Sequence, residues 1–224
     1  MKILPLLLAV CGCALALHAD ETAATVKLSR PGQPAVLKIR LPQGQLHVSP
    51  GDSPDTIAVK STAAKPATTT RDDGLRVLGD TTTGFTLTEA DNTAVLNYGG
   101  NSPWPTGNGA AFTITAPAST ALEIDTGWGG AVTIERMTGS VAIKGMNTPV
   151  QLVDLGGGVL VESMNGEINA SFTTLPEKAP LSFSSMHGAI TLRLPAEARA
   201  NVRLRSHNGA ILTDFPETAL QTKT

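Results

Sequence analysis

Five residues in the second half of the chain have types and spacings that could align them for chemistry. They are Asp125, Lys144, Glu162, Ser184 and Arg205, separated by 19, 18, 22 and 21 residues. In a repeat fold such a column would place acids and bases on successive units, where they could act on a polysaccharide. The same alternation of charge also gives modest cross-strand stabilisation on a solvent-facing sheet. We expect the structural role, and predict no catalytic residue.

Trp104 is the one aromatic residue whose surroundings suggest ligand contact. It lies between two prolines in "SPWPTGNG", and a rigidly held indole can stack on a sugar or dock a partner. It could equally plug the end of the fold. The candidate ligand-binding residues are therefore Trp104, Asp125 and Glu162.

Metal and nucleotide chemistry find little support in the sequence. Outside the first 19 residues the histidines are His47, His187 and His207, and a metal site would need two or three of them to converge with carboxylates. The sequence contains no nucleophile elbow, phosphate-binding loop or HExxH motif. We therefore predict no metal and no cofactor.

The elements that must position these residues are revealed by a regular spacing of apolar residues. Val132, Val141, Val150, Val159 and Ile168 lie nine residues apart, and the series continues at Leu181, Ile190, Val202 and Ile211. From each mark, apolar and polar residues alternate, as in a half-buried β-strand. The pattern predicts nine short strands that each present an apolar row to one core.

Two kinds of corner alternate between these strands, so the full repeat is about 18 residues. One kind is nearly the same phrase three times: "SMNGEI" at 163–168, "SMHGAI" at 185–190 and "SHNGAI" at 206–211. Asn and Gly suit such a corner because they tolerate positive φ. If successive coils stack, one column consists of Trp128, Met146, Met164, Met186 and His207. The next column consists of Gly129, Asn147, Asn165, His187 and Asn208. We predict an all-β fold, a β-solenoid with coils of two short strands; an antiparallel β-meander or sandwich is the alternative, because Asn-Gly is also a hairpin signal.

The first half of the chain alternates less evenly. Strands are predicted at "VLKIR", "LHVS", "TIAVKS", "FTLTE", "FTIT" and "LEID", with polar loops at 62–74 and 97–109 between them. We expect residues 20–110 to form an irregular N-terminal β region or cap, and residues 111–224 to form the solenoid repeats with a short C-terminal tail.

The first 19 residues read as a signal peptide. One Lys precedes an apolar run from Ile3 to Leu17, and small residues suit cleavage after Ala19. Lipidation of Cys13 is the minority alternative. Cleavage would remove both cysteines and leave 16 Lys and Arg against 19 Asp and Glu, so we expect no nucleic-acid partner and no transmembrane segment in the mature chain.

Three stretches carry a family resemblance: "LPQGQLHVSPGDSPDTIAVKS", "LEIDTGWGGAVTIERMTGSVAIKG" and the Asn-Gly phrases. Over roughly residues 41–215 the chain resembles the exported bacterial β-strand-repeat proteins of the "putative adhesin" family, whose function is unknown. It departs from their pattern at "MNTPV", where Thr148 and Pro149 replace the usual Gly and small residue. The resemblance implies a β-solenoid-like fold, an exported bacterial protein and no catalytic residues to carry over.

Together, the repeat and the resemblance favour a non-enzymatic, adhesin-like interaction or scaffold module at the cell envelope, periplasmic or on the cell surface. Its partner would be a protein or polysaccharide, and its terminal strands could pair edge to edge with a second copy. A polysaccharide-binding or polysaccharide-cleaving solenoid is the alternative.

Overall fold

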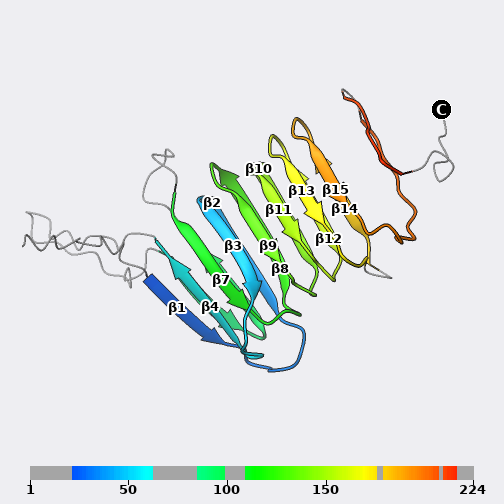
Figure 1. Cartoon of the computed structure of the whole chain (residues 1–224). Helices are drawn as coiled ribbons and strands as arrows, with labels where there is room; N and C mark the ends of the chain where they lie inside the picture. Colours follow the sequence, from blue (N-terminus) through cyan, green and yellow to red (C-terminus); the bar gives the residue numbers. More distant parts are fainter. Residues whose placement is uncertain (1–21, 63–84, 99–108, 176–178, 207–208, 216–224) are drawn as a thin grey trace, which may run out of the picture.

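The computed structural model describes residues 22–62, 85–98, 109–175, 179–206 and 209–215, and these residues form two stacked β-sheets (Figure 1). The predicted leader, Cys13, Trp104 and His207 lie outside them. The eight-stranded sheet has the order β1 (Thr22–Lys27), β4 (Thr56–Ser61), β7 (Ala111–Ala116), β3 (Gln45–Pro50), β9 (Val132–Glu135), β11 (Val150–Val153), β13 (Ile168–Ser171) and β15 (Ile190–Arg193). The seven-stranded sheet has the order β14 (Leu181–Ser185), β12 (Val159–Ser163), β10 (Val141–Asn147), β8 (Ala121–Trp128), β2 (Val36–Gln43), β6 (Thr93–Asn97) and β5 (Thr86–Ala90).

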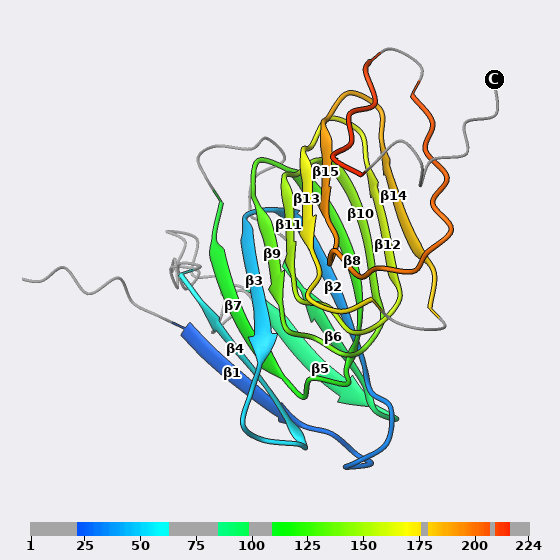
Figure 2. The same cartoon turned by 45° about the vertical axis from the view of Figure 1, so that its right-hand side comes forward.

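From β8 onward the chain alternates between the two sheets, and each strand pairs in parallel with the strand one coil away. Val141 lies opposite Val159 in one sheet, and Val150 lies opposite Ile168 in the other. Figure 2 shows the two sheets facing each other across the coil interior. Parallel pairing one coil apart is a β-solenoid and not a meander, so the predicted fold class is confirmed.

The core lies between the two sheets and includes the apolar rows that the alternation predicted, together with corner residues such as Met137 and Leu155. Exposure is at most 2% for Val132, Ile134, Val141, Ile143, Val150, Leu152, Val159, Val161 and Ile168. Each such side chain contributes about 1.5–3 kcal/mol of gross hydrophobic stabilisation. Since a single coil buries few of them, the fold is held by the stacking of successive coils.

The Asn-Gly corner repeats because each glycine packs directly onto the coil before it. A Cβ on Gly166 would overlap the carbonyl oxygen of Thr148, and one on Gly188 would overlap that of Gly166. The expectation of positive φ is wrong for the corners at Gly166 and Gly188, which do not have positive φ, whereas Gly129 at the first corner does, with a φ of 73°. Close approach of backbones, and not a left-handed conformation, therefore selects glycine here.

A serine three residues before the glycine completes this corner. The Gly166 N–H donates to Ser163 Oγ at 2.9 Å, and the Gly188 N–H donates to Ser185 Oγ at 2.8 Å. Because the hydroxyl accepts a backbone N–H that the turn leaves without a strand partner, it stabilises the turn in the manner of an ST motif.

The departure at "MNTPV" is a compensated exchange of small and large residues. The coil of β10 has Gly145 where the coils of β12 and β14 have Ser163 and Ser185, and Thr148 where they have glycine. Thr148 is 1% exposed, and its Oγ1 lies 2.9 Å from Thr126 Oγ1. A Cβ on Gly145 would lie 3.2 Å from the Thr148 Cβ, so the missing side chain at 145 makes room for the threonine.

The N-terminal half extends the parallel stack by β2 and β3 and, next to them, by β6 and β7, and it adds an antiparallel end. β2 pairs in parallel with β8, and β3 pairs in parallel with β9, although these strands are far apart in sequence. Beyond them, β4 is antiparallel to both β1 and β7, and β5 is antiparallel to β6. These antiparallel pairs form the N-terminal end of the stack, whereas β2 and β3, which fall within the residues 20–110 expected to form the cap, lie inside the parallel stack.

The C-terminal end differs from the sequence prediction. The segments 201–206 and 209–215 form no strands, and Val202, Leu204 and Ile211 are 58%, 52% and 51% exposed. Two of the nine predicted strands are therefore wrong. The apolar row thins before them, since Ile190 is already 41% exposed; a coil at the end of the stack has a neighbour on one side only, which removes half of the packing that orders an inner coil.

Candidate ligand-binding surface

The outer face of the seven-stranded sheet carries a row of charges that alternate in sign. The register places Arg40 opposite Asp125, Asp125 opposite Lys144, and Lys144 opposite Glu162. Ser184 of β14 continues the row, which we call the charge row. Two of the three candidate ligand-binding residues, Asp125 and Glu162, are thus brought onto one face of the sheet.

The membership of the row differs at both ends from the column expected from the sequence. Arg205 lies in the segment without strand structure and does not pair with β14. Arg40 joins the row because β2 stacks beside β8, a contact that the spacing of the repeats did not reveal.

The four charged side chains of the row are exposed and available to a ligand. Among the described residues, the side chains of Arg40, Asp125, Lys144 and Glu162 make no ion pair and no hydrogen bond, although neighbouring strands lie only about 4.8 Å apart. One position along, on the same face, Lys38 Nζ and Glu123 Oε2 do form an ion pair at 3.0 Å. The charged groups of the charge row are therefore exposed and not paired with other side chains of the described residues.

An open groove of about 420 Å³ adjoins the charge row at the ends of β10, β12 and β14. Its lining residues are Lys144, Gly145, Glu162, Ser163, Met164, Ser184, Ser185 and Met186. Glu162 and Lys144 thus belong to both the row and the groove, whereas Asp125 lies one strand beyond the groove. The groove is thus lined by residues that carry a carboxylate, an ammonium group, hydroxyls and thioethers.

This arrangement suits binding better than acid–base catalysis. Asp125 and Glu162 are two strands apart, about 10 Å between Cα atoms, with Lys144 between them. Both side chains are exposed, whereas a carboxyl group that acts as a general acid near neutral pH is usually buried so that its pKa is raised. Among the described residues, no group of three or more His, Asp or Glu side chains is arranged to hold a metal ion.

The corner beside the groove carries exposed apolar side chains and stacked amides. Trp128, Met146, Met164 and Met186 are 53%, 40%, 43% and 69% exposed, and Asn165 Nδ2 donates to Asn147 Oδ1. The predicted alignment of Trp128 with Met146 is wrong by one residue, because Trp128 lies opposite Asn147. The coil from β8 to β10 is 19 residues long and not 18, which shifts the register.

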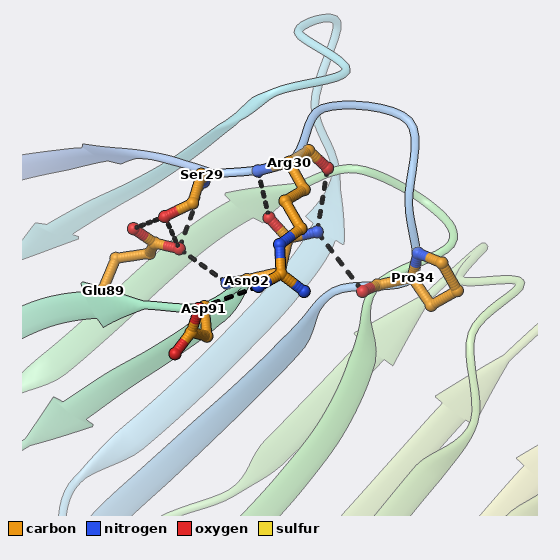
Figure 3. A network of polar contacts seen from close by, with 6 residues as sticks. All are labelled: Ser29, Arg30, Pro34, Glu89, Asp91 and Asn92. Atoms are coloured by element: carbon orange, nitrogen blue, oxygen red, sulfur yellow. Dashed lines mark hydrogen bonds and ion pairs between the residues drawn. The ribbon is translucent and has the colours of Figure 1, made fainter.

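A second polar cluster, at the N-terminal end, has a structural role (Figure 3). Asn92 is 4% exposed; its Nδ2 donates to the Arg30 carbonyl at 2.9 Å and its Oδ1 accepts from the Arg30 N–H at 2.7 Å. Glu89 accepts from the Ser29 hydroxyl at 2.8 Å. This hydrogen bond, together with those from the Ser29 and Asn92 backbone N–H groups, holds the pKa of Glu89 below its usual value. The cluster ties the β5–β6 turn to the segment between β1 and β2.

Comparisons with known proteins bear on the fold alone. No family model matches the chain, and no curated protein matches it. Among solved structures, it is similar to a protein of Clostridium sporogenes ATCC 15579 described as a "putative cell adhesion protein". The match has a TM-score of 0.50 at 11% sequence identity and covers 78% of this chain and 99% of the other.

The stacked two-sheet architecture is therefore shared with a protein described in terms of cell adhesion, as the resemblance to the β-strand-repeat proteins led us to expect. Among the residues that the structure describes, no helix is long and apolar enough to cross a membrane.

Proposed function

We propose that this protein is an exported, non-enzymatic interaction module of the bacterial cell envelope, and that the charge row and the adjoining groove form its contact surface. The observation that carries the proposal is the set of four alternating charges without internal partners, beside a groove that contains two of them. Exposed charges without internal partners lose little on meeting a complementary ligand, because no existing ion pair has to be broken.

The regular spacing of the row supports a repetitive partner. Parallel in-register strands repeat each position about every 4.8 Å, so a partner with evenly spaced polar groups meets several positions at once. A polysaccharide or an extended protein segment at the cell surface has this property. The likeness to a protein described as a putative cell adhesion protein agrees with such a role.

Polysaccharide cleavage is the second candidate, because Glu162 lines a groove of a size that admits a sugar ring. A cleaving enzyme would need Glu162 to act as an acid or base on the bound chain. This candidate differs from the first in one observable: soluble sugars are released.

The test is a binding screen of residues 20–224 against bacterial and plant polysaccharides and envelope proteins, with released sugars assayed in parallel. Glu162→Gln and Lys144→Gln should weaken binding about tenfold or more, as expected when a charged contact is lost. Glu167→Gln is the matched control, because Glu167 is exposed but lies outside the row and the groove. Equal binding by all three variants would show that the contact surface lies elsewhere, and sugar release that is lost in Glu162→Gln would establish the enzyme.

A further inference from the structure

The methionines of this chain are concentrated in one place. The sequence has five methionines, of which Met1 lies in the predicted leader. Met137 is a core residue with 0% exposure. The remaining three, Met146, Met164 and Met186, occupy equivalent positions on consecutive coils, and we call them the methionine column.

Backbone hydrogen bonds fix the alignment of the methionine column. The Met164 N–H donates to the Gly145 carbonyl at 3.1 Å, and the Met186 N–H donates to the Ser163 carbonyl at 3.2 Å. One residue on, the Asn165 N–H donates to the Met146 carbonyl at 2.9 Å and the His187 N–H to the Met164 carbonyl at 2.9 Å. Adjacent methionines are therefore held at the strand spacing of about 4.8 Å, close enough for their flexible side chains to bring two or three sulfur atoms together.

The column is accessible and borders the groove. Its members are 40%, 43% and 69% exposed, so exposure rises along the stack, and Met164 and Met186 line the groove together with Glu162. His187 follows Met186 directly and is also exposed. Two thioethers and one carboxylate, those of Met164, Met186 and Glu162, thus line one groove. Met146 lies beside Met164 on the neighbouring strand, and His187 follows Met186 in the chain.

We infer that the methionine column is a binding site for a soft monovalent metal ion, Cu(I) or Ag(I). Thioether sulfur is a soft ligand that selects such ions over Zn(II), Mg(II) or Ca(II). It carries no proton at any ordinary pH, so no proton has to be displaced on binding. The site would use Met164 and Met186 as its central pair, with Met146 or His187 as a third ligand.

The charges of the groove are compatible with a monovalent ion. Thioethers are neutral and leave the charge of the ion uncompensated, while Glu162 supplies one carboxylate in the same groove. Lys144 also lines the groove, but it lies on β10, so that β12 with Glu162 separates it from Met186 on the β14 coil. The predicted export of the chain removes Cys11 and Cys13, so the methionines would be the softest ligands that remain.

The inference is tested by titrating Ag(I), as silver nitrate in chloride-free buffer, into residues 20–224, with isothermal calorimetry and native mass spectrometry as readouts. Cu(I) is measured anaerobically by competition with a chromophoric Cu(I) chelator. We expect one ion per chain, no comparable binding of Zn(II), and a loss of affinity of about 100-fold in the double variant Met164→Leu/Met186→Leu. Met137→Leu is the control, since it removes a thioether from the core and should bind the ion as the wild type does.

Leucine is chosen because it keeps the volume and apolar character of methionine, so thermal melting should change little in the double variant. Absence of stoichiometric Ag(I) and Cu(I) binding would overturn the inference, as would undiminished binding in the double variant. If the leucine variant instead loses a polysaccharide or protein partner and the wild type binds no metal, the column is an apolar contact surface. Failure of metal binding leaves the charge-row proposal unaffected, because that proposal rests on Glu162 and Lys144.

Discussion

Substitution of Gly166 by alanine tests whether close backbone approach explains the repeated corner. The new Cβ would overlap the Thr148 carbonyl oxygen, lie 2.5 Å from the Thr148 carbonyl carbon and lie 2.7 Å from Ser163 Oγ. Carbon atoms in contact are normally about 3.5–4.0 Å apart, so the two coils must separate by about 1 Å at this corner. The atoms that would have to move are backbone atoms and not the end of a flexible side chain.

The cost follows from what that separation disturbs. Overpacking a well-packed position costs about 1–3 kcal/mol, and the nearby Asn165 N–H to Met146 carbonyl bond, 2.9 Å long, would lengthen as well, at about 1 kcal/mol. We expect Gly166→Ala to lower the free energy of unfolding by about 3 kcal/mol in urea titrations. For a chain of this size, that corresponds to a fall in Tm of about 6–12 °C.

Gly209→Ala is the matched control, because Gly209 stands in the same phrase, "SHNG", but in the open C-terminal segment. The atom nearest to a Cβ there is Ser206 Oγ at 3.3 Å, the end of a side chain that can rotate away. Alanine also restricts the unfolded chain, which is worth about 0.4–1 kcal/mol in favour of the folded state when the native site accepts it. We expect unchanged or slightly higher stability. Equal destabilisation by the two substitutions, or none by Gly166→Ala, would refute the packing explanation.

Three further predictions concern the core and the N-terminal cluster. Val161→Asp should lower the free energy of unfolding by about 4 kcal/mol or more, because it buries a charge without a partner at a position with 0% exposure. The neighbouring substitution Glu162→Ala should leave the melting temperature nearly unchanged. Equal melting temperatures for the two variants would contradict the assigned alternation of buried and exposed residues. Asn92→Ala should lower stability by about 2 kcal/mol in urea, since it removes several hydrogen bonds from a buried side chain, and a neutral effect would show that the loop is held by other contacts. The folded-state pKa of Glu89 is lowered, so its stabilising contribution should be full above the unfolded pKa of about 4.3 and be lost as the pH falls through the folded pKa. The difference in free energy of unfolding between wild type and Glu89→Gln should therefore shrink between pH 6 and pH 3. A constant difference would exclude a stabilising role for the ionised Glu89 carboxylate.

The alternation of apolar residues predicted the strands well, because each strand buries one side and exposes the other. All six strands proposed in the first half are present, as are the seven from Val132 to Ile190. β1 and β6 were not predicted from the sequence. Such short alternating runs are hard to distinguish from loops, and their pairing depends on neighbours far away in the sequence.

The local alternation of apolar and polar residues does not predict the order in which the coils stack. β2 and β3 stack between strands that follow them much later in the chain, and this is why Arg40 was missed as a member of the charge row. The position of Trp128 was missed for a related reason, since one additional residue in the β8 coil shifts its register by one. The alignment of Asp125, Lys144 and Glu162 was predictable because these residues lie on consecutive coils of nearly constant length.

The linear stacking of coils also determines how the molecule would respond to mechanical load. In Figure 1, β1 lies at one end of the stack and the C-terminal segment at the other, so tension between the two ends acts along the stacking axis. The hydrogen bonds between coils point along the same axis, and those of the outermost coil would open one after another as its strand peels away. The protein should thus yield at modest force by shedding coils from the loaded end, and should lengthen in steps of one coil while the remaining coils stay folded.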